Sequence, residues 1–196
     1  EVYYGMQDPT KYIEMMNKDE YIAWNWYLRN AYYIREGGSM SDPMKERPAW
    51  AQVPDSWFNI PGVDWQDEMT QIAPISNYQI SASTSGDIGS LYISGGYFSQ
   101  DGVIINSYFN RMNFRANGIL NVGDNLKIGM TLAPSYSDQD DRASEGKETS
   151  YHHALTQSPL VQLDEATGDW GMPQGIGTVY TNPVEQNKYT IANTRR

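Results

Sequence analysis

The feature that constrains the fold most is a regular alternation of apolar and polar residues between positions 76 and 132. Successive side chains of a β-strand point to opposite faces of the sheet, so a period of two predicts strands with one apolar and one polar face. The alternation is interrupted by "SGD" at 85–87 and by "GDN" at 123–125. Such short polar turns join antiparallel neighbours, and the segment therefore predicts two consecutive hairpins over about 76–137.

The two faces of these hairpins carry different kinds of residue. The polar face is built from Asn, Ser, Gln, Arg and Gly, which suit a confined, wet lumen where side chains hydrogen-bond to one another. In a transmembrane β-barrel the apolar face meets lipid and the polar face lines the interior. We therefore expect Arg111, Asn113, Arg115 and Asn117 to face a lumen, and Leu91, Ile93, Phe114 and Ile128 to face lipid.

The lengths of the connections support the same interpretation. Both tight turns fall at one end of the expected sheet, and the longer connections fall at the other, as in outer-membrane barrels. An aromatic girdle is expected near the long-loop end, from Tyr97, Phe98, Tyr108, Phe109 and Tyr136. The predicted fold is all-β, an antiparallel transmembrane β-barrel fragment of about five or six strands. Its parts are an outer loop with a short helix over about 8–75, the hairpins, and a long outer loop over about 138–190.

So few strands cannot enclose a wet lumen, and open sheet edges in lipid would leave backbone groups unpaired. We therefore expect the chain to be part of a larger barrel. A secreted, aromatic-rich β-sandwich that binds carbohydrate remains the alternative, since aromatic residues make up 13% of the sequence. A fragment of a secreted glycan hydrolase is disfavoured because no separated pair of carboxylates stands out.

Composition excludes other classes. The net charge of −10 disfavours nucleic acid as a partner, because such binding depends on clustered Lys and Arg. The absence of cysteine removes disulfides and Cys-ligated zinc, and no apolar run reaches the roughly eighteen residues of a transmembrane helix. One helix is predicted after Asn17, which acts as an N-cap with Glu20 three residues later, and it ends at Gly37–Gly38.

The hairpin region resembles a known family. The segments "VDWQDEM" at 63–69, "NYQISASTSGDIGSLYISGGYFSQDGVIINSYFNRMNFRAN" at 77–117 and "NPVEQ" at 182–186 are similar to the early barrel region of SusC/RagA-type TonB-dependent receptors of Bacteroidota. This resemblance implies a transporter of the Gram-negative outer membrane, energised by the TonB complex, that imports glycans or oligopeptides together with a SusD-like surface lipoprotein. It implies no enzymatic activity and no cofactor.

Several motifs can be interpreted either as functional sites or as ordinary structural residues. The carboxylates at 64, 67 and 68 are too close together for a glycosidase pair and favour a structural role. The neighbouring histidines at 152 and 153 lack a third ligand at suitable spacing, so we expect no metal site. The acidic run at 138–146 lacks the spacing of an EF-hand. Aromatic residues of the irregular segments are candidates for contact with ligand in the outer loops, namely Trp50, Trp57, Trp65 and Trp170.

Overall fold

The computed structural model describes residues 1–140, 150–163, 170–171, 182–189 and 193–195. The chain divides into two compact units, each described by itself below. The sheet unit comprises Glu1–Thr10, Thr70–Glu145 and Asn187–Arg196. The helical unit comprises Lys11–Met69 and Gly146–Gln186.

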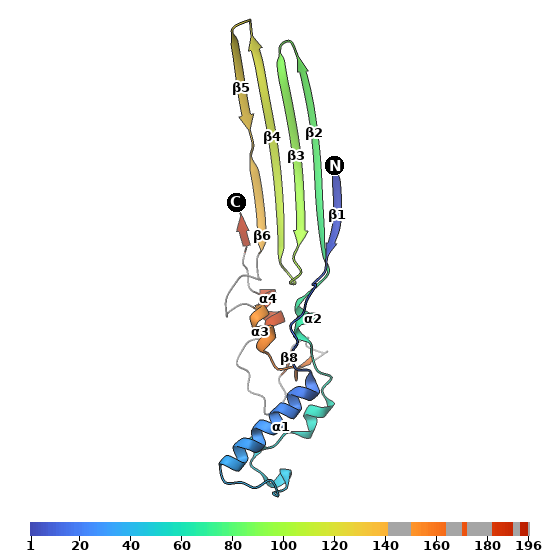
Figure 1. The fold of residues 1–196 in the computed structure, drawn as a ribbon, viewed down its shortest axis with the longest axis vertical. Coiled ribbons are helices and arrows are strands. Elements are labelled where there is room, and N and C mark those ends of the chain that lie inside the picture. The colour runs from blue at the N-terminus through green and yellow to red at the C-terminus, as the bar shows by residue number, and fades with distance from the viewer. Residues whose placement is uncertain (141–149, 164–169, 172–181, 190–192, 196) are drawn as a thin grey trace. The chain divides into compact units, whose positions relative to one another are not determined.

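The sheet unit is an antiparallel sheet of long, neighbouring strands (Figure 1). In spatial order its strands are β1, β2, β3, β4, β6 and β9, with β5 also paired to β4. The hairpins predicted from the alternation are confirmed, and the sheet is not closed within the described residues. The strand bounds are β1 Val2–Gln7, β2 Ala73–Gly86, β3 Gly89–Asp101, β4 Tyr108–Val122, β5 Leu126–Leu132, β6 Ser135–Asp140 and β9 Asn193–Arg195.

Strands β5 and β6 pair with β4 in one continuous register. Ala116 pairs with Leu132 in β5, and Asn113 pairs with Ser135 in β6, so no residue is inserted between them. The interruption lies at Pro134, which has no N–H to donate but still accepts a hydrogen bond from Phe114 N at 3.0 Å. Strand β6 continues to Asp140, two residues past the position at which a long loop was expected to begin.

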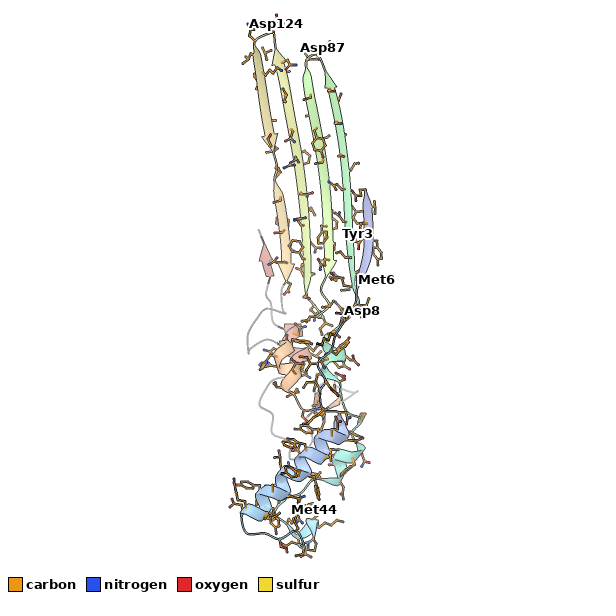
Figure 2. All side chains as sticks on the ribbon, in the orientation of Figure 1. Tyr3, Met6, Asp8, Met44, Asp87 and Asp124 are labelled. Carbon is orange, nitrogen blue, oxygen red and sulfur yellow. The ribbon has the colours of Figure 1, made fainter. Side chains whose placement is uncertain are left out.

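The two tight turns lie at the same end of the sheet, where Figure 2 labels Asp87 and Asp124. Gly89 follows the first turn with φ +149°, and a Cβ atom there would lie 2.0 Å from the carbonyl oxygen of Ile119. Only glycine fits this close approach. The second turn begins at Gly123 with φ +65°, a conformation that glycine adopts readily.

The helical unit is organised around α1 (Lys18–Arg35). Asn17 and Glu20 form the predicted capping box, in which each side chain bonds the backbone N–H of the other residue. Buried apolar side chains join the helix to the following segment and to Leu160, and the cluster consists of Ile22, Val53, Trp57, Ile60 and Leu160. The other elements are η1 Met44–Glu46, η2 Ala49–Ala51, η3 Asp55–Asn59, α2 Trp65–Met69, α3 Ser150–Thr156, β7 Gln162–Leu163 and β8 Trp170–Gly171.

One helix falls within a segment expected to be loop. Helix α4 (Pro183–Tyr189) begins after Asn182, whose side-chain oxygen accepts hydrogen bonds from Val184 N at 2.9 Å and Glu185 N at 3.3 Å. Asparagine at the N-cap followed by proline is a recognisable helix start. Among the described residues, no helix is long and apolar enough to cross a membrane.

Candidate functional site

The two faces of the sheet are the candidate functional surfaces of the chain. Leu91, Ile93, Phe114 and Ile128 lie on one face, and the strand register places each beside other apolar or small residues. All four are exposed, from 40% for Ile93 to 52% for Ile128. Water would not stabilise so large an apolar face, so this face requires an apolar environment that the described residues do not provide.

The apolar face has a sharp boundary toward the long connections. One row of paired residues across five strands is aromatic or aliphatic and consists of Val2, Tyr78, Tyr97, Met112 and Tyr136. The next row away from the tight turns, on the same face, is mostly polar and consists of Tyr4, Ser76, Ser99, Asn110 and Asp138. The face thus changes from apolar to polar within one row, at a line marked by tyrosines.

The aromatic residues expected in a single girdle are divided between the two faces. Tyr97 and Tyr136 lie in the boundary row of the apolar face. Phe98 and Phe109 instead lie on the opposite face, where their ring centroids are 6.0 Å apart. Because neighbouring residues of a strand alternate between faces, a pair such as Tyr97–Phe98 cannot belong to one girdle. That part of the expectation was wrong.

The opposite face carries the polar set. Arg111, Asn113, Arg115 and Asn117 alternate along β4, and the register sets them beside Phe98, Gly96, Ser94 and Tyr92 of β3. The Arg111 guanidinium lies 5.9 Å from the centre of the Phe98 ring. The structure therefore places the four residues proposed for a lumen together on one face, and the four proposed for lipid on the other.

The helical unit buries some of its tryptophans and exposes others. Trp57 is fully buried, and Trp65 is 4% exposed and donates from its indole nitrogen to Ser158 O at 2.8 Å. Trp24 is 46% exposed and stacks on Tyr27 with ring centroids 5.7 Å apart. The backbone of Trp170 lies in β8, and its side chain is outside the described residues. Ligand contact by Trp57, Trp65 or Trp170 stays a prediction. The exposed Trp24 is better placed for such a contact than the buried Trp57 and Trp65.

Trp24 was expected on the apolar face of this helix, and neither it nor Tyr27 was proposed as a ligand contact. In the structure the buried residues of α1 are Ile22 and Asn30, which lie eight residues apart on one face. Residues 24 and 27 point away from that face. A shallow groove beside the two rings is lined by Glu14, Met15, Met16, Glu20 and Ala23.

A second cleft of the helical unit has a volume of about 590 Å³. Its wall is held by Gln66, whose amide accepts from Ile13 N at 2.9 Å and donates to Ile13 O at 2.7 Å. The pKa of Tyr151 is raised by burial and by the nearby Tyr12 and Asp64. The residues that line the cleft are Tyr12–Asp19, Pro61–Gln66, Ala154, Gln157 and Pro159.

A buried arginine organises the end of α1. Arg47 donates from Nη1 to the side-chain oxygen of Asn30 at 2.5 Å and from Nε to Asp42 O at 3.0 Å. The Asp42 carboxylate accepts from Ser39 N at 2.9 Å and from the Tyr33 hydroxyl at 2.8 Å. The Ser39 and Tyr33 hydrogen bonds lower the pKa of Asp42, and the bond to Asp42 raises the pKa of Tyr33. These contacts fix loop geometry and supply no reactive group.

The acidic and histidine motifs have local structural roles. Asp64 precedes α2 and accepts from Gln66 N at 2.9 Å, as a helix N-cap does. His153 is buried and its Nδ1 lies 2.5 Å from the side-chain oxygen of Gln186. Within the described part of the chain no group of three His, Asp or Glu side chains is arranged to hold a metal ion. The acidic run at 138–146, which lacks the spacing of an EF-hand, lies largely outside the described residues.

The chain is similar in sequence to two known receptors. The chain is 30% identical over 137 residues to TonB-dependent receptor P3 of Formosa agariphila, a match that covers 70% of the chain. It is 26% identical over 184 residues to TonB-dependent receptor P26 of the same species, covering 93% of the chain. The chain matches a segment of TonB-dependent receptors. These matches span 11% and 17% of the lengths of the two receptors, and no family model matches the chain.

Proposed function

We propose that this receptor segment forms part of the wall and outer loops of an outer-membrane transporter. The observation that carries the proposal is the exposed apolar face and its height. Met112 marks the tyrosine boundary row and Val122 the last residue before the tight turn, ten residues further along β4. At about 3.4 Å per residue the apolar stretch is about 34 Å long. A tilt of about 40° reduces this to about 26 Å, which matches the roughly 25 Å apolar band of outer-membrane barrels.

The same face argues against the soluble sandwich. In a sandwich a second sheet packs about 10 Å away and buries the apolar side chains. Among the described residues no sheet covers Leu91, Ile93 or Phe114, which are 40–47% exposed. The wall of a transmembrane barrel satisfies both faces, because lipid meets the apolar face and a wet lumen meets the Arg- and Asn-bearing face behind it. Closure then requires further strands, supplied by other parts of the receptor.

We propose further that the receptor is of the SusC/RagA type and lies in the outer membrane of a Bacteroidota-like bacterium. In this scheme the segments 8–75 and 141–190 are outer loops that meet the solute and a SusD-like lipoprotein. The solute is a glycan or an oligopeptide, and the TonB complex supplies energy for its import. The exposed pair Trp24 and Tyr27 supports a role in recognition, because aromatic rings provide rigid contact area.

Uptake measurements test the transport proposal. Radiolabelled glycan and peptide digests are supplied to cells with the receptor gene intact, deleted, or restored on a plasmid. We expect uptake of one class of solute to be lost on deletion, and to be lost equally when a protonophore removes the energy source of TonB. We also expect a surface lipoprotein to co-purify with the receptor. Uptake that persists through both treatments for every solute would overturn the proposal.

A further inference from the structure

We propose that Arg111 and Arg115 form a binding site for an anionic group, a carboxylate or a sulfate, of a solute that moves along the polar face of the sheet. The inference rests on the proposed function, because it takes this face as the wall of a transport path. It adds a class of solute, namely one that carries negative charge, and the residues that recognise it.

The first observation is the sign of the charges on this face. The strand register assigns the polar face Arg111 and Arg115 of β4 and Lys127 of β5. Within the described strands whose side chains are placed, the acidic residues Asp101, Asp138 and Asp140 belong to the other face, beyond the tyrosine boundary row. Glu1, whose backbone pairs with Gln79 at the edge of the sheet, adds one carboxylate to the polar face. An excess of cations on the described part of this face contrasts with the net charge of −10 of the chain.

The second observation is that the two arginines have no ion-pair partner among the described residues. Neither Arg111 nor Arg115 forms an ion pair with any described residue, and both are exposed. The contact recorded for Arg111 is with the face of the Phe98 ring at 5.9 Å, which leaves the edges of the guanidinium available as donors. A guanidinium with free edges binds carboxylate or sulfate oxygens through two parallel hydrogen bonds.

The third observation is the space between the two arginines. They are four residues apart on β4, so their Cα atoms are separated by about 14 Å. Between them, Asn113 pairs with Gly96, and a Cβ atom on Gly96 would lie within 2.3 Å of the Asn113 side-chain oxygen. The asparagine amide therefore lies across the glycine instead of standing between the arginines. The Phe98 ring lies beside the Arg111 guanidinium at one end of this stretch.

These features specify the ligand by its chemistry. Two arginines whose Cα atoms are about 14 Å apart suit an extended solute with repeated anionic groups, or one anionic group held by either arginine in turn. The amide of Asn113 and the hydroxyl of Ser94 add uncharged hydrogen-bonding groups beside the arginines. Lys127 lies further along the same face, where it pairs with Asn121 of β4.

Thiol labelling of the whole receptor in outer-membrane vesicles tests the site without knowledge of the solute. This chain has no cysteine, so Asn113→Cys introduces one thiol between the arginines, in a receptor cleared of any other cysteine. Two methanethiosulfonate reagents of similar size are compared, one carrying a sulfonate and the other a trimethylammonium group. With two arginines whose Cα atoms lie about 7 Å from that of residue 113, we expect the ratio of anionic to cationic labelling rates to exceed that of free cysteine by about fivefold or more at 0.15 M salt.

Matched charge removals provide the controls. Arg111→Gln with Arg115→Gln should return the ratio to that of free cysteine. Lys127→Gln removes a cation from the same face about 27 Å further along the strand, and should leave the ratio unchanged. Sodium citrate should slow labelling by both reagents more than sodium chloride of equal ionic strength, and the double substitution should abolish this protection.

Other outcomes overturn the inference. A ratio like that of free cysteine, or protection by citrate no greater than by chloride, means that the arginines do not create an anion site. Failure of both reagents to reach the thiol means that a protein segment, through its own carboxylates, occupies the arginines instead of the solute. Failure of the transport proposal is detected separately, as low accessibility to oxygen of a nitroxide attached at position 114 on the other face before the receptor is returned to lipid, because a lipid-facing label is readily reached by oxygen.

Discussion

An arginine placed on the apolar face should destabilise the receptor in a way that depends on its position along the strand. Leu91 pairs with Gly118, six residues from Met112 and four from Val122, so it lies near the middle of the apolar band. Tyr136 lies in the boundary row. An arginine on the lipid face costs about 2–4 kcal/mol at the midplane and about 0–1 kcal/mol near the interface.

The expected result is therefore a graded series. Leu91→Arg should lower the free energy of unfolding by about 2–4 kcal/mol, which is about a 30- to 900-fold change in the folding equilibrium constant. Tyr136→Arg should lower it by less than about 1 kcal/mol. Tyr92→Arg is the matched control, because residue 92 is at the depth of Leu91 but on the polar face, and its effect should be small. Denaturant titration of the receptor in lipid vesicles, followed by tryptophan fluorescence, measures all three.

Two results would refute the reasoning. If Leu91→Arg and Tyr136→Arg destabilised the receptor equally, the face would be packed against protein, because a protein core has no interface at the tyrosine row. If Tyr92→Arg were as harmful as Leu91→Arg, the polar face would not be wet.

Three further predictions concern the helical unit. Trp57→Ala should destabilise it by about 3–5 kcal/mol through loss of a fully buried ring, whereas Trp24→Ala should have an effect below about 1 kcal/mol, as measured by hydrogen exchange of α1. Asn17→Ala removes the N-cap and should destabilise the first turn of α1 by about 1 kcal/mol, with faster exchange of its Asp19 and Glu20 amides and no change at the other end of the helix. Because the pKa of Asp42 is lowered in the folded state, the stability from its bonds to Ser39 and Tyr33 should be complete above the ordinary carboxyl pKa of 3.8 and should decrease as pH falls through the lowered value. NMR titration of the Asp42 carboxyl tests this, and a pKa at or above 3.8 would contradict it.

The strands were predictable because their pattern is local. A period of two specifies which residues share a face, and "GDN" marks the second turn without tertiary information. The continuation of the sheet beyond Pro134 was not predictable in this way. The proline interrupts the hydrogen bonds of its own strand, but β4 is long enough to pair with residues on both sides of it.

The sequence was less informative about the tryptophans. Tryptophan suits a buried core and an exposed binding surface equally well, because its ring is apolar and its nitrogen is a donor. Which role applies depends on tertiary contacts, such as the bond from Trp65 to Ser158, 93 residues away. The arginine pair was visible in the sequence as an alternation, but Gly96 beneath Asn113 became evident only from the register between β3 and β4.

The central claim is that the sheet has one face in lipid and one in water, and a nitroxide scan along β4 tests it most directly. Single spin labels are placed at each position from 111 to 121 of the receptor in lipid vesicles, and accessibility to oxygen and to a water-soluble nickel complex is measured. The account predicts oxygen maxima at even positions, including Phe114, and nickel maxima at odd positions, including Asn113 and Arg115, with a period of two. Low accessibility to both probes at the even positions would contradict it, because that result means protein and not lipid covers the apolar face.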